Sequence, residues 1–158
     1  SELSNVDLPK AANVVVAFEV FEHINEPKQF LSDIAKITKD GGLLIISTPN
    51  VDGLEVAALG NRSNTIMFDH VRLYSPDSIA YILDQEGWDL LLVETPGLFD
   101  IEMIRDQFQA GRIDLATDPA LRFICEADDA IRVQFQSFLQ RQLLSSHMKL
   151  VARKRRSL

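Results

Sequence analysis

Ala17-Phe18-Glu19-Val20-Phe21-Glu22-His23, residues 17 to 23, is the stretch that decides how the rest of this chain is interpreted. It continues the apolar run that starts at residue 13, and such a run is typical of a buried parallel strand. Two carboxylates and an imidazole then follow at the carboxyl end of the strand, where open α/β sheets place their ligands. The stretch therefore predicts a chemical site at that edge of a sheet.

Helices and strands alternate after this stretch. Pro27 suits the first turn of a helix, whose buried face is expected to hold Phe30, Leu31, Ile34 and Ile37. Gly41 and Gly42 are expected to stop that helix, and residues 43 to 47 to form a second buried parallel strand that ends at Pro49.

The next helix and strand have clear boundary signals. Ser75-Pro76-Asp77 combines a hydroxyl cap with a proline in the first turn, and Gly87 is expected to stop the helix that begins there. Residues 88 to 94 are then predicted to form the next strand. These elements indicate an α/β fold.

A helical region separates that strand from the last one. Apolar residues recur at helical spacing between residues 98 and 144, and residues 148 to 153 have the pattern of a final strand. We interpret residues 1–97 and 145–158 as one core domain, and residues 98–144 as a helical insertion. The insertion is a candidate for a substrate lid or an oligomer contact, although aromatic residues at helical spacing are more often core.

Composition excludes some classes of function. The 158 residues carry a net charge of −7, which argues against a nucleic-acid partner in spite of the basic end at residues 153 to 156. The single cysteine, Cys125, cannot form an internal disulfide. With neither a long apolar run nor a signal peptide, the sequence leads us to expect a cytoplasmic protein without a membrane partner.

A second informative stretch is residues 39 to 50, Lys39-Asp40-Gly41-Gly42-Leu43-Leu44-Ile45-Ile46-Ser47-Thr48-Pro49-Asn50. Together with residues 17 to 23, it resembles the second half of a class I S-adenosylmethionine-dependent methyltransferase. The resemblance covers residues 4 to 96 and resumes at residues 147 to 153. It implies a partial Rossmann-like sheet of family strand order 4-5-7-6, with the last strand antiparallel. It also implies methyl transfer to an oxygen or nitrogen acceptor, which the sequence does not identify.

The sequence departs from that family at the front. None of its seven glycines lies in a Gly-x-Gly-x-Gly setting, so the turn that grips the cofactor in the family is missing. We therefore expect a truncated domain that is inactive alone, although its intact parent would be a methyltransferase. The resemblance implies that the main chain of Ala17, Phe18 and Glu19 borders the cofactor, and that Asn5 or Asp7 lies near its adenine.

The resemblance also supplies candidate site residues. Glu19, Glu22, His23 and His70 match the metal ligands of small-RNA 2′-O-methyltransferases, and the first three match those of ubiquinone-pathway O-methyltransferases. Carboxylate and imidazole ligands suit magnesium or zinc. His23 and His70 are alternatively general bases, and Asn50 is a candidate substrate contact.

Each of these residues also has an ordinary structural interpretation. Glu22 and His23 would cap and orient the next helix while Glu19 faces water. His70 would be a hydrogen-bonded loop residue, and Asn50 a turn residue after proline.

Two further alternatives for the whole chain remain open. One is a non-catalytic interaction module that uses residues 98 to 144 as its partner surface, and the other is a metal-assisted 2′-O-methyltransferase. Without further strands of the sheet, the strand at residues 13 to 18 would have an unpaired edge, through which we expect the chain to form a homo-oligomer.

Overall fold

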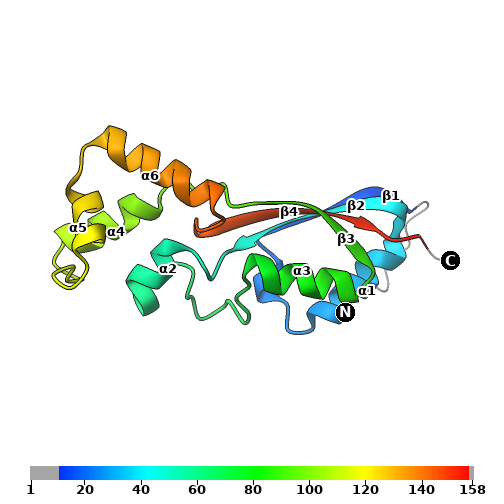
Figure 1. Ribbon diagram of the computed structural model, residues 1–158. Coiled ribbons are helices and arrows are strands. Elements are labelled where there is room, and N and C mark those ends of the chain that lie inside the picture. The colour runs from blue at the N-terminus through cyan, green and yellow to red at the C-terminus, as the bar shows by residue number, and fades with distance from the viewer. Residues whose placement is uncertain (1–10, 157–158) are drawn as a thin grey trace.

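The computed structural model describes residues 11–156, in which four strands form one sheet (Figure 1). The strands are β1 (Ala12–Phe18), β2 (Thr38–Pro49), β3 (Trp88–Glu94) and β4 (His147–Lys154). Their order is β1-β2-β4-β3, with β1 parallel to β2 and β4 antiparallel to both of its neighbours. The predicted α/β fold, strand order and antiparallel last strand are confirmed.

Two helices cover one face of the sheet. Helix α1 (Pro27–Ile37) and helix α3 (Pro76–Gln85) pack in one core with β2 and β4, and Figure 1 shows both helices on the same side of the strands. The fully buried side chains of this core include Leu31, Ile79, Leu44 and Leu150. Both helices begin at the predicted proline, because proline is tolerated in the first turn of a helix.

Helices also gather at one end of the sheet. They are α2 (Leu54–Leu59), the short 3₁₀ helix η3 (Gly60–Arg62), α4 (Asp100–Gln109), α5 (Pro119–Glu126) and α6 (Asp129–Arg141). A second core of Leu59, Ile104, Leu115, Leu121 and Cys125 holds α2, α4 and α5 together. The expected helices between residues 98 and 144 are present, and the division of the chain at residues 97 and 144 stays a prediction.

A buried carboxylate fastens the helical end to the sheet. Asp100, the first residue of α4, is fully buried. It accepts hydrogen bonds from Ser145 Oγ at 2.6 Å, Gln136 Nε2 at 2.6 Å and Ser146 N at 2.7 Å. The start of α4, the middle of α6 and the approach to β4 are therefore joined at one side chain.

The expectation that Gly41 and Gly42 stop the first helix is wrong. Helix α1 ends at Ile37 and β2 begins at once, with Thr38 pairing with Ala12 and donating its hydroxyl to Ile34 O at 2.7 Å. Gly41 instead lies within β2 at a φ of 76°, a backbone conformation that side chains disfavour. The strand begins this early because Thr38 pairs with Ala12 of β1.

Every helix within residues 11–156 is too short or too polar to span a lipid bilayer.

Candidate functional site

The site lies at the end of the sheet where β1 and β2 finish. After Phe18 the chain turns at Glu19, which has a φ of 52° and donates its backbone N–H to Ser47 O at 3.0 Å. A short 3₁₀ helix, η2 (Phe21–His23), then brings Glu22 and His23 back toward the end of β2. This strained turn therefore places a carboxylate and an imidazole beside two parallel strand ends.

Glu22, His23 and His70 form a cluster. Each offers one ligand atom, and these atoms lie within 4.8 Å of one another. Glu22 is 1% exposed and accepts a hydrogen bond from Thr48 Oγ1 at 2.9 Å, while its other oxygen lies 3.8 Å from His23 Nε2. The two imidazole rings meet edge to face with centroids 5.0 Å apart.

Backbone carbonyls orient both imidazoles. His23 Nδ1 lies 2.8 Å from Asp69 O, and His70 Nδ1 lies 2.8 Å from Thr65 O. Because a carbonyl oxygen only accepts hydrogen bonds, each Nδ1 must carry the proton. In the neutral rings Nε2 is then the unprotonated nitrogen, which is the form that can accept a proton or bind a metal ion.

The loop that carries His70 is held at several points. Arg72 N donates to Glu22 O at 3.1 Å, and its side chain donates to Asn25 O at 3.0 Å. At the other end of the loop, Ser63 Oγ donates to Glu55 Oε2 at 2.7 Å and accepts from Thr65 N at 2.9 Å. These contacts hold the loop so that His23 and His70, which are far apart in the sequence, lie next to each other.

Glu19 lies apart from the cluster, although the sequence grouped it with the other three candidates. Its carboxylate accepts from Ser47 Oγ at 2.6 Å and lies 3.3 Å from His147 Nε2, with half of its side chain exposed. His147 was missed by sequence reasoning. The signal that could have found it is the antiparallel register, which sets His147 opposite Pro49 at the same end of the sheet.

Asn50, the candidate substrate contact, makes several hydrogen bonds within the structure. It is fully buried, and its amide nitrogen donates to Leu143 O at 3.0 Å and Ser145 O at 2.9 Å. Its amide oxygen accepts from Asp52 N at 3.1 Å, which is the local contact of a turn residue. Asn50 therefore ties the end of β2 to the approach to β4.

The other expectations from the sequence concern the start of α1, the end of β1 and two residues outside the described part of the chain. Helix α1 has Glu26 at its N-cap with no side-chain cap bond, so neither Glu22 nor His23 caps it. Ala17 is buried, whereas the side chain of Phe18 is 55% exposed. Asn5 and Asp7 lie outside the described residues.

A buried tyrosine adjoins the cluster. The ring of Tyr74 lies 4.8 Å from that of Phe21, and its hydroxyl has no hydrogen-bond partner among residues 11–156. Burial raises the pKa of Tyr74 to about 12, with Arg72 opposing the shift and Glu22 adding to it. The hydroxyl therefore keeps its proton at neutral pH.

The chain is similar to known methyltransferases in its sequence. The model of a family described as methyltransferase domain matches residues 4–93. A probable S-adenosylmethionine-dependent methyltransferase of Mycobacterium tuberculosis is 31% identical over 107 residues, which are 67% of this chain and 37% of that protein. The mitochondrial ubiquinone biosynthesis O-methyltransferase of Dictyostelium discoideum is 41% identical over 46 residues, 29% of this chain and 14% of that protein.

Solved structures show the same fold. A protein solved in complex with the Haloferax volcanii Trm112 methyltransferase activator aligns with all of this chain and 60% of its own, at a TM-score of 0.55 and 16% identity. The chain spans little more than a third of the length of the curated Mycobacterium relatives that it matches.

Proposed function

This chain belongs to the methyltransferase domain family, and on that premise we propose that its protein transfers a methyl group from S-adenosylmethionine to an oxygen or nitrogen acceptor. The names of the curated relatives support this activity. The observation that carries the proposal is the cluster of Glu22, His23 and His70 at the strand ends, where open α/β sheets place their ligands.

The two imidazoles fit a role as proton acceptors. S-adenosylmethionine, when bound, supplies an electrophilic methyl group, so that the acceptor's lone pair forms the new bond while the carbon–sulfur bond breaks. Nε2 of His23 or His70 takes the proton that the acceptor loses, because the backbone carbonyls keep the proton of each neutral ring on Nδ1. The neighbouring Glu22 carboxylate stabilises the imidazolium that results.

The end of β1 fits one wall of a cofactor site. Ala17 and Phe18 are the last paired residues of β1 and the main chain turns away at Glu19, while the half-exposed ring of Phe18 offers apolar surface. The sequence lacks a Gly-x-Gly-x-Gly turn, so these contacts supply only part of the affinity that a cofactor needs. We therefore propose that these 158 residues alone bind the cofactor weakly and are inactive.

A divalent cation is a second candidate occupant of the cluster. Donor atoms that share a tetrahedral zinc ion at about 2.0–2.2 Å lie about 3.3–3.6 Å from one another, so donors spaced up to 4.8 Å would have to approach by up to about 1.5 Å. Glu22, His23 and His70 would hold the ion, which would orient an acceptor hydroxyl and lower its pKa. The Nδ1 contacts to carbonyls match the way that metal-binding histidines are usually oriented.

The visible absorption of cobalt(II) tests whether a cation binds to this cluster, because its bands change when imidazole ligands bind the ion. His70→Ala is expected to weaken binding at least tenfold, because loss of even an outer-shell partner of a metal ligand typically costs 10–100-fold in affinity. His147→Ala is the matched control, since His147 lies at the same end of the sheet but contacts Glu19. Equal loss in both variants, or no cobalt bands in the unchanged protein, would contradict a cation at this cluster.

Calorimetric titration with S-adenosylhomocysteine tests the methyltransferase proposal itself. We expect the longest protein that the gene encodes to bind the compound, and the 158-residue chain to bind it far more weakly. Failure of both forms to bind would overturn the proposal and favour a non-catalytic interaction module.

A further inference from the structure

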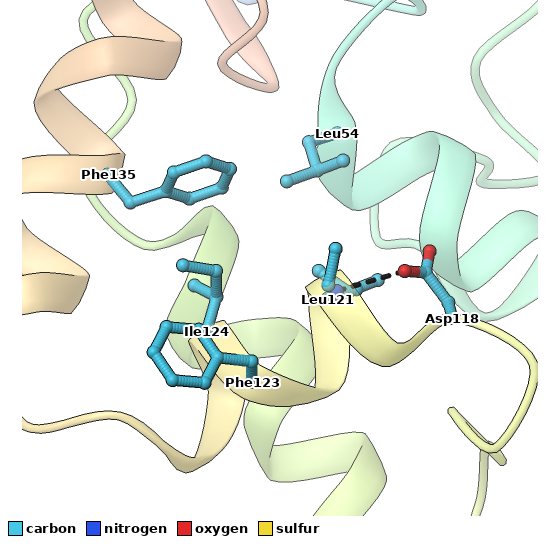
Figure 2. Close-up of a pocket in the computed structure, with 7 residues that line it drawn as sticks. Leu54, Asp118, Leu121, Phe123, Ile124 and Phe135 are labelled. Atoms are coloured by element: carbon cyan, nitrogen blue, oxygen red, sulfur yellow. Dashed lines mark hydrogen bonds between the residues drawn. The ribbon is translucent and has the colours of Figure 1, made fainter.

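A pocket of about 420 Å³ opens in the helical end of the molecule, away from the cluster of Glu22, His23 and His70. Three helices line it: α2 contributes Leu54, α6 contributes Phe135, and α5 contributes most of the rest (Figure 2). Figure 2 shows Leu54 and Phe135 pointing toward one another across the space above α5. Its volume falls within the range of small-molecule sites, roughly 300–1,000 Å³.

The lining of the pocket is apolar except at one position. Six of the lining side chains are hydrocarbon, namely Leu54, Ala120, Leu121, Phe123, Ile124 and Phe135. A polar group buried against them would lose its hydrogen bonds to water without replacing them, at a cost of roughly 1–3 kcal/mol or more. The lining therefore favours a hydrocarbon group in the interior of the pocket.

Among residues 11–156, Asp118 is the one charged residue that lines the pocket. It is the N-cap of α5, where one carboxylate oxygen accepts from Leu121 N at 2.9 Å, and it is exposed. The next charges along α5, Arg122 and Glu126, pair with each other at 2.9 Å and so offset one another. The exposed carboxylate of Asp118 is thus the formal charge that the lining presents, and it disfavours an anionic head group.

From this lining we infer that the pocket binds the hydrocarbon tail of a small amphiphile whose head group is neutral or cationic. Phe123 is 62% exposed in the described structure, and a bound tail would cover part of its ring. The pocket is walled by three helices, and its size suits a single chain or ring better than the face of a partner helix. This inference concerns binding alone and does not rest on methyl transfer.

Methyl NMR titration with two ten-carbon probes tests the charge preference. Decyltrimethylammonium and decyl sulfate share one tail and differ in head charge, and each is added below the concentration at which it forms micelles. We expect shifts confined to the methyl groups of Leu54, Leu121 and Ile124, with the cation bound about fivefold more tightly, as one partly exposed charge contact provides. Asp118→Asn should make the two affinities equal, because asparagine keeps the helix cap but removes the charge.

A blocking variant tests the location of binding. Ala120→Trp should reduce the affinity for the cation at least tenfold, because the indole occupies the pocket and Ala120 is itself exposed. Ala130→Trp is the matched control, since Ala130 is also an exposed second residue of its helix but does not line the pocket.

Several outcomes would overturn the inference. They are tighter binding of decyl sulfate, equal losses in the two tryptophan variants, and shifts spread over both cores. Concentration-dependent shifts of the pocket methyl groups without any probe would show that a second copy of the chain fills the pocket, and would also overturn it.

Discussion

At the scale of single residues, Asp100 is expected to contribute strongly to stability. Its buried carboxylate accepts three hydrogen bonds, from Ser145, Gln136 and Ser146. Asp100→Ala would remove the acceptor of Ser145 Oγ and Ser146 N, while Gln136 Nε2 keeps its bond to Gly97 O at 2.9 Å, so we predict a loss of about 3 kcal/mol in the free energy of unfolding, measured with urea. Asp106→Ala, in the exposed part of the same helix, should change stability by less than about 0.5 kcal/mol. A similar loss in both variants would contradict this role.

Glu55 gives stability a specific dependence on pH. Burial raises the pKa of this carboxyl above its ordinary value of 4.5, with the Ser63 hydrogen bond opposing the shift. The folded chain therefore keeps a proton that the unfolded chain loses, and the contribution of Glu55 to stability falls as the pH rises above 4.5.

Glu55→Gln removes that titration. We predict that the variant gains stability relative to the unchanged protein as the pH rises from 4 to 7, measured by urea unfolding at each pH. The exposed Glu26→Gln is the control and should show no such gain. A stability difference for Glu55→Gln that does not vary with pH would contradict the assignment.

The residue types predicted where the site lies, but not which of the candidate side chains come together in it. His23 and His70 could be matched to one edge of the sheet because strand ends and the loops that follow them share that edge. The separation of Glu19 from Glu22 could not be predicted, because it depends on a positive φ at Glu19 and on a hydroxyl from β2. The burial of Asn50 likewise depends on carbonyls more than 90 residues away.

At the scale of elements, the cap of α3 is a local contribution that can be measured. Ser75 Oγ accepts from Ser78 N, and Ser78 Oγ accepts from Ser75 N. Ser75→Ala is predicted to lower the free energy of unfolding by about 1 kcal/mol, the usual cost of losing an N-cap hydroxyl. Ser137→Ala within α6 should be neutral or slightly stabilising, because alanine is the better residue in a helix interior. Equal effects of the two substitutions on urea unfolding would rule out the cap.

Helices and strands were predictable where the apolar periodicity agrees with the residues that begin or end an element. Strand β3 and helix α3 have the predicted boundaries, since a serine cap, a proline and Gly87 mark them. The start of β2 was not predictable in this way. Residues 38 to 42 read as the end of a helix, and only the pairing of Thr38 with Ala12 makes them a strand.

At the scale of the whole molecule, the sheet has an open edge and an open apolar face. Strand β1 pairs with β2 on one side, and no other strand within residues 11–156 pairs with it. Val14, Val16 and Phe18 are each about half exposed on the same face of β1. Edges of this kind favour pairing with another chain, so self-association of the 158-residue chain stays our prediction.

A charge on that face tests self-association. Val16→Lys is predicted to shift the chain toward monomer in sedimentation velocity, because lysine on an edge strand opposes pairing. Val133→Lys on α6 is the control, since Val133 is 65% exposed but lies on the helical end. A monomer before any substitution, or an equal effect of both lysines, would refute pairing through β1.

The central claim is that residues 17 to 23 form part of the methyl-transfer site. Hydrogen exchange of the longest protein that the gene encodes, with and without S-adenosylhomocysteine, tests it most directly. We predict slower exchange at residues 17 to 23 when the compound is bound, and unchanged exchange at residues 119 to 135. Binding that leaves residues 17 to 23 unchanged would contradict the account.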